Sequence, residues 1–136
     1  DETTLPATKQ AAVGLMGGSQ WARNLDNPTN AAFVEAFEAE YGYAPSLYAS
    51  QGYDAALILD AALAAAGTAE AGPLAEAMKA VEMETTRGAF RFGPNNFPVQ
   101  DFWLVEAVEQ DGAYVTLAQE KVFETHSDAY AEDCRM

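Results

Sequence analysis

The sequence predicts an α/β fold in which helices lie on a partial sheet and a β-hairpin follows near the C-terminus. Two segments with helical periodicity, residues 28–41 and 46–66, come after a short apolar run. The hydrophobic period changes from 3.6 to 2 near residue 87, where strands begin. Two strand-like runs then flank Asp111-Gly112, and an Asp-Gly pair is a strong hairpin signal.

The composition limits the class of protein. The chain has 136 residues, 49% of them hydrophobic, which suffices for one domain-sized core. Asp and Glu total 21 against 7 Lys and Arg, for a net charge of −14. Nucleic acid and anionic membrane surfaces are therefore not expected as partners, because binding to either requires clustered positive charge on the protein. No run approaches the ~18 apolar residues of a membrane-spanning helix.

The first half of the chain predicts a strand and a helix. Residues 10–18, QAAVGLMGG, are expected to form a buried strand that enters a tight turn. Asn27 then caps a helix with Pro28 in its first turn, and Gly42 ends it. The inner stripe of this helix is Phe33, Phe37 and Tyr41.

Two more helices follow. Pro45 and Ser46 lead into the segment that ends at Gly67, and residues 55–66 are apolar on nearly every side. Gly72-Pro73 opens a shorter third helix. Its inner stripe is Leu74, Ala77, Met78 and Val81.

The last third predicts strands. Phe90 and Phe92 alternate with polar or small residues, GPNN at 93–96 is a turn, and strands are expected at 99–109 and 113–123. These few strands cannot cover the apolar helices. The chain therefore resembles one part of a larger sheet protein.

The residues give no enzyme signature and no metal or cofactor motif. His126, the only histidine, lies in a polar stretch and is expected to be exposed. Gly17-Gly18 is only half of a phosphate loop, and the acid pair Glu82/Glu84 is typical of an acidic surface. Cys134 is the only cysteine, so no internal disulfide is possible.

Tyr48 is the aromatic residue most suited to bind a ligand. It lies in SLYASQGY, among small and polar residues at the entry to the second helix. Loops at strand ends are where α/β folds bind ligands, and a phenol offers an apolar wall with one polar tip.

Three motifs together resemble the C-terminal half of periplasmic binding proteins of the branched-chain amino-acid (Leu/Ile/Val) transporter family. Within that family, their residues are most similar to the branch that binds aromatic acids. The motifs are D-N-P-x-N-x-x-F, Y-G-x-x-P-S-x-Y-A-x-Q-G-Y-D-A and R-G-x-F-R-F…Q-D-F. The resemblance covers about residues 17–134.

This resemblance implies part of a type I periplasmic-binding fold, in which two lobes are joined by hinge strands. Residues 1–21 would be the end of the second lobe and a hinge strand, and residues 22–98 would complete the first lobe. Residues 99–136 would cross the hinge again and finish the second lobe. The signal peptide, and a disulfide partner for Cys134, would lie upstream.

The resemblance also implies a function without catalysis. The chain would be part of the periplasmic ligand-binding component of an ABC-type importer for amino acids or related small carboxylates and aromatic acids, and it would use no cofactor. Tyr48 would contact the ligand, with Trp21 and Gln51 at the rim of the site. A membrane permease would be one partner, and the rest of the protein or a second copy would cover the apolar faces.

Two other functions are kept open. A sensory receptor domain of the same fold would signal instead of transporting, and neighbouring genes or a fused transmembrane segment would reveal it. A small acidic hydrolase would show turnover and a clustered acid–base pair, for which the sequence offers no residues.

Overall fold

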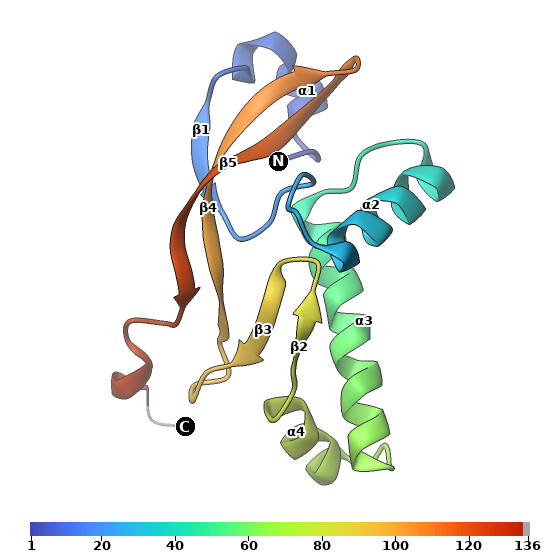
Figure 1. The fold of residues 1–136 in the computed structure, drawn as a ribbon, viewed down its shortest axis with the longest axis vertical. Helices are drawn as coiled ribbons and strands as arrows, with labels where there is room; N and C mark the ends of the chain where they lie inside the picture. Colours follow the sequence, from blue (N-terminus) through green and yellow to red (C-terminus); the bar gives the residue numbers. More distant parts are fainter. Residues whose placement is uncertain (135–136) are drawn as a thin grey trace.

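The computed structural model describes residues 1–134. These residues form four α-helices, two 3₁₀ turns and five strands (Figure 1). In order they are α1 (Leu5–Thr8), η1 (Lys9–Ala12), β1 (Met16–Ser19), α2 (Pro28–Tyr41), α3 (Leu47–Ala66), α4 (Ala71–Lys79), β2 (Glu82–Thr85), β3 (Gly88–Phe92), β4 (Pro98–Gln110), β5 (Ala113–His126) and η2 (Ala131–Asp133).

Strand β4 joins two parts of the sheet. The strand order is β1-β4-β3-β2, β5 pairs with β4, and every pair is antiparallel. Pro98 and Val99 of β4 pair with β3, whereas residues 103–106 pair with β1. Figure 1 shows β4 running between the α3–α4 part of the molecule and the α1–β1 part. Residues 100–102 therefore cross from one part to the other.

The caps of α2 and α3 are those expected from the sequence. The Asn27 side chain accepts a hydrogen bond from the Asn30 N–H at 2.8 Å, and Ser46 accepts one from the Ala49 N–H at 3.3 Å. Gly42 and Gly67 end the two helices with φ of 73° and 64°, in the left-handed region that glycine adopts without strain.

Two hydrophobic clusters hold the helices to the strands. One surrounds Trp21 and Phe33, whose rings meet edge to face at 6.2 Å, and it includes Val105 of β4. The other joins Ile58 and Ala62 of α3 to Val81 and Phe90 beside and within the β2–β3 hairpin. Each cluster ties one end of the α2–α3 layer to a different part of the sheet.

The strand expected over residues 10–18 is wrong for most of its length. Residues Lys9–Ala12 form a 3₁₀ turn, and the strand covers only Met16–Ser19. Alanine favours strands weakly, and Ala12 packs into a small cluster with Leu5 and Ala107. Gly17 and Gly18, expected in a turn, lie within the strand. The strand is also exposed rather than buried in this structure.

The sequence did not indicate β2. Glu82 and Glu84 alternate with the half-buried Met83 along a strand whose one partner in the described part of the chain is β3. An edge strand tolerates charged residues on its open side, and they hid the two-residue period. The other expected strands and the hairpin at Asp111-Gly112 are confirmed.

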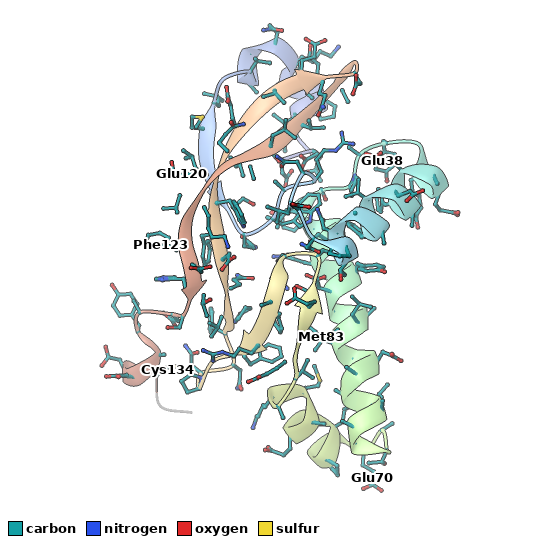
Figure 2. The ribbon with its side chains drawn as sticks, viewed as in Figure 1. Glu38, Glu70, Met83, Glu120, Phe123 and Cys134 are labelled. Atoms are coloured by element: carbon teal, nitrogen blue, oxygen red, sulfur yellow. The ribbon has the colours of Figure 1, made fainter. Side chains whose placement is uncertain are left out.

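Several apolar side chains stay exposed on the faces of α2 and α3. Tyr41 is 58% exposed, Tyr53 39% and Leu59 42%. Within residues 1–134, no single helix is long and apolar enough to cross a membrane, although α3 and α4 pass that test as a pair bent by 116°. Figure 2 shows the side chains, with Cys134 near the C-terminal end, where its thiol is free and exposed.

Candidate ligand-binding site

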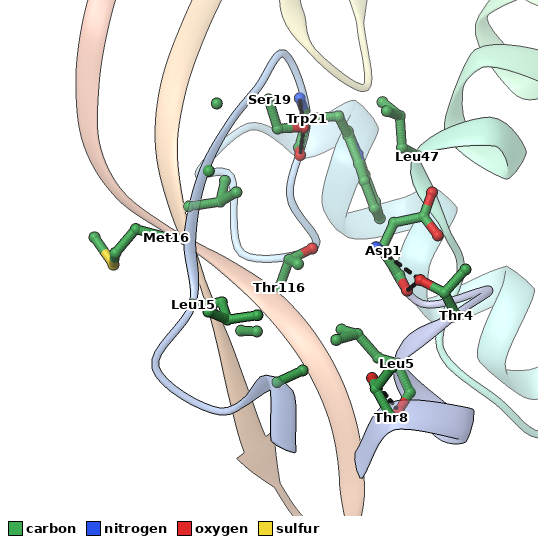
Figure 3. Close-up of a pocket in the computed structure, with 15 residues that line it drawn as sticks. Asp1, Thr4, Leu5, Thr8, Leu15, Met16, Ser19, Trp21, Leu47 and Thr116 are labelled. Carbon is green, nitrogen blue, oxygen red and sulfur yellow. Dashed lines mark hydrogen bonds between the residues drawn. The ribbon is translucent and has the colours of Figure 1, made fainter. Parts of the chain in front are cut away.

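A cavity of about 380 Å³ lies between the α1–β1 segment, the first residue of α3 and the β4–β5 hairpin (Figure 3). Leu47 forms the α3 side of the cavity. Val105 and Ala107 of β4 also line it, and they belong to the part of the sheet that contains β1. Segments on both sides of the β4 crossing therefore contribute to one space.

The wall of this cavity is mainly apolar. Trp21 closes it beside the end of β1, and its side chain is only 1% exposed. The apolar and glycine residues that line it are Leu5, Ala12, Leu15, Met16, Gly17, Gly18, Trp21, Leu47, Val105 and Ala107. Such a surface fits a hydrocarbon chain or an aromatic ring.

The hydroxyl groups on the wall already donate their protons within the chain. Thr4 donates to the Asp1 carbonyl at 3.2 Å, and Thr8 to the Leu5 carbonyl at 3.2 Å. Ser19 Oγ donates to the Trp21 carbonyl at 2.7 Å. Thr116 Oγ1 donates to Glu2 Oε1 at 2.7 Å. These side chains retain acceptor capacity but offer no free proton to an anion.

The three residues expected at the site lie in different environments. Trp21 lines the cavity and donates its indole N–H to Asn30 Oδ1 at 2.7 Å, so its ring is held rigidly. Tyr48 follows Leu47 on the first turn of α3 but is 65% exposed and does not line the cavity. Gln51, half-buried on the next turn, also lies outside the lining. Their contacts with a ligand stay predictions.

Leu47 and the β1 glycines are cavity residues that sequence reasoning missed. Gly17-Gly18 stands out in the sequence, but as half of a phosphate loop rather than as a side-chain-free wall. Leu47 is one residue before Tyr48, so the segment identified from the sequence does contribute a side chain to the cavity. Leu5 and Ala107 carry no local signal, because only the tertiary fold brings them together.

A buried polar network joins residues of two of the sequence motifs. Asp54 of α3 is fully buried, and its Oδ2 accepts a hydrogen bond from Arg87 Nε at 2.8 Å. Its Oδ1 accepts from the Thr86 N–H at 2.8 Å. Arg87 Nη1 donates to Gln100 Oε1 at 2.7 Å, in the crossing segment of β4. One cation and one anion pair here away from water, with further hydrogen bonds around them.

The comparisons with known proteins agree with this architecture. The family model described as "Periplasmic binding protein" matches residues 1–113. The chain belongs to the periplasmic binding protein family. No match was found among the curated proteins.

Solved relatives of this periplasmic binding protein are solute-binding proteins of ABC transporters. One from R. palustris, in complex with benzoate, is 33% identical over 100% of this chain and 37% of its own, with a TM-score of 0.84. One from Sphaerobacter thermophilus is 32% identical over 91% of this chain and 35% of its own, with a TM-score of 0.80. One from Desulfitobacterium hafniense, in complex with Leu, is 32% identical over 78% of this chain and 32% of its own, with a TM-score of 0.64.

These relatives confirm the fold class and set the scale of the chain. It forms part of a type I periplasmic-binding fold and spans about a third of the length of each solved relative. The relatives are binding proteins, in keeping with the lack of an enzyme signature in the sequence.

A second hollow of about 360 Å³ in this periplasmic binding protein is less suited to an anionic ligand. It lies between the β2–β3 turn and the β4–β5 hairpin. Lys121 sits there 2.6 Å from Asp101, and this hydrogen bond raises the pKa of Lys121. The charged residues that line the hollow are Asp26, Glu84, Arg87, Asp101, Lys121 and Glu124. Carboxylates outnumber cations, so the local field repels an anion.

Proposed function

We propose that this chain is the C-terminal share of the ligand-binding component of an ABC importer, and that the protein binds a small aromatic or aliphatic carboxylate. The observation that carries the proposal is the apolar cavity whose walls come from both sides of the β4 crossing. The 33% identity with a benzoate-bound solute-binding protein over the whole chain supports the ligand class.

Within this proposal the chain divides at its crossings. Residues 1–21 end the second lobe and enter the hinge, residues 22–98 complete the first lobe, and residues 99–136 return through the hinge to the second lobe. The change of β4 partners between Val99 and Trp103 supports the boundary near residue 99. The connection from β1 to α2 supports the boundary near residue 21.

Binding by such a protein needs no covalent step. A ligand that touches Leu47 on one side and Val105 and Ala107 on the other gains contacts only when the two sides are close. It therefore shifts an equilibrium between open and closed forms toward the closed form. Tyr48 and Gln51 lie on the first turns of the same helix as Leu47, and we expect them to contact a bound molecule from that helix.

The cavity wall selects the apolar body of the ligand. The hydroxyl protons of the wall are already donated within the chain, so these hydroxyls would not act as donors to a ligand carboxylate. The whole protein would act in the periplasm and deliver its ligand to a membrane permease, as expected for an ABC solute-binding protein. The family and its solved relatives support this placement.

Calorimetric titration of the complete two-lobed protein tests the proposal. Benzoate and leucine are the two probes, because solved relatives are in complex with them. Saturable 1:1 binding of either probe is the expected result. No heat and no change in intrinsic fluorescence with either probe, or with other aromatic and aliphatic acids, would overturn the proposal.

A further inference from the structure

The β2–β3 turn is hydrogen-bonded to α3, to the N-cap of α2 and to the crossing segment of β4. Thr86 donates its N–H to Asp54 of α3, and its hydroxyl lies 2.7 Å from Ser50 Oγ. Its carbonyl accepts a hydrogen bond from Asn27 Nδ2 at 3.1 Å, and Asn27 caps α2 where the chain leaves the β1 connection. Arg87 then reaches Gln100 of β4.

The residues of this turn are deeply buried. Thr85 and Thr86 are 0% exposed and Arg87 is 8% exposed. A buried charge network fixes geometry strongly, since moving either partner leaves a charge unpaired away from water. Arginine suits this place because its planar group donates in two directions at once, from Nε to Asp54 and from Nη1 to Gln100.

Both ends of this network lie on elements that also supply residues of the cavity wall. Asp54 lies two helical turns after Leu47, so the two side chains share one face of α3. Gln100 lies on β4 in the crossing segment, five residues before Val105. Leu47 and Val105 face the same cavity from opposite parts of the molecule.

We propose that Arg87 is a positioning residue for ligand binding, because through Asp54 and Gln100 it holds the first half of α3 at a set distance and angle from the crossing segment of β4. It touches no ligand itself. This inference rests on the proposed function and adds to it the residue that aligns the two halves of the site. The Asp54–Arg87–Gln100 link thus transmits any displacement of the crossing strand to the Leu47 wall.

The variant Gln100→Met tests the link in the complete protein. It removes the acceptor for Arg87 Nη1, keeps the side-chain length and leaves the Asp54–Arg87 pair intact. The milder variant Gln100→Asn shortens the side chain by one methylene and so moves the amide away from Arg87. It replaces Gln100→Met in the test if that variant does not fold. The matched control is Asn95→Leu, which deletes another buried amide, one that donates to Asp128 Oδ2 at 2.7 Å and lies outside the link.

Two readouts are needed. Benzoate and leucine affinities are expected to fall roughly tenfold in Gln100→Met and to stay unchanged in Asn95→Leu, even where both lose similar thermal stability. Hydrogen exchange without ligand is expected to quicken in residues 47–54 as well as 99–104 of Gln100→Met. A purely structural role would not transmit the change to α3.

The outcomes separate this inference from the proposed function. Unchanged affinity in both Gln100 variants, or faster exchange confined to β4, would overturn the inference while the proposed function stands. If the unmodified protein binds neither probe, the proposed function fails, and hydrogen exchange alone decides whether the link couples α3 to β4.

Discussion

At the scale of single residues, Tyr48 is expected to contribute to ligand affinity and Trp21 to the stability of the fold. Tyr48 is 65% exposed at the start of α3, so it contributes little to the folded chain. Tyr48→Ala is expected to weaken ligand binding by about 1–3 kcal/mol, the contribution of one aromatic wall, with almost no change in melting temperature. Calorimetry and thermal denaturation of the complete protein measure the two effects.

Tyr43 is the matched control for Tyr48. It is 63% exposed and contacts Phe37 and Tyr41 away from the cavity. Tyr43→Ala should leave affinity unchanged. Equal affinities for all three proteins, or a large loss of stability in Tyr48→Ala alone, would remove Tyr48 from the site.

Trp21 is expected to act on stability through its hydrogen bond. Trp21→Phe keeps an aromatic ring but leaves Asn30 Oδ1 buried without the indole N–H, at a cost of about 1–3 kcal/mol. Trp103→Phe is the control, because the buried indole N–H of Trp103 has no partner among residues 1–134. Urea denaturation should show the larger loss for Trp21→Phe, and equal losses would contradict the role given to this bond.

At the scale of elements, a glycine inside α3 and the glycine that ends it are expected to change stability in opposite directions when replaced by alanine. Gly52 lies inside the helix with open space where a Cβ would be, so Gly52→Ala should raise stability by about 1 kcal/mol. Gly67 has φ of 64°, and Gly67→Ala should lower stability by about 1 kcal/mol. Chemical denaturation measures both variants; the same sign for both would contradict the assigned helix end.

Local chemistry made most of the helices and the hairpin predictable from the sequence. Asn27, Ser46 and the glycines that follow each helix act on their own neighbours, and Asp111-Gly112 forms its turn within four residues. Residues 10–18 were misassigned because a short apolar run does not distinguish a strand from a helical turn, and its Ala and Gly residues favour strands weakly. Strand β2 was missed because its acidic residues lie on a sheet edge.

The site was less predictable because its parts are distant in sequence. The segment around Tyr48 was identified, but the cavity wall is Leu47 together with residues of α1, β1 and β4. Asp54, Arg87 and Gln100 all belong to the sequence motifs. Only the fold shows that their side chains are hydrogen-bonded to one another. Aromatic residues draw attention in a sequence, whereas walls of Leu, Gly and Ala do not.

At the scale of the whole molecule, the exposed apolar faces predict association of the isolated chain. Tyr41, Tyr53 and Leu59 remain open to solvent on α2 and α3. Among residues 1–134, β1 and β2 each have one neighbouring strand. Residues 1–136 alone are expected to dimerise, exchange elements or pack against another fragment. Light scattering that finds a monomer with a two-state melting transition would refute this expectation.

The most direct measurement is a crystal structure of the complete protein grown with benzoate. We expect the ring to lie in the cavity, in contact with Leu47 and close to Trp21, with the crossing segment of β4 between the two lobes. A bound benzoate that touches neither α3 nor the β1–β4 wall would contradict it.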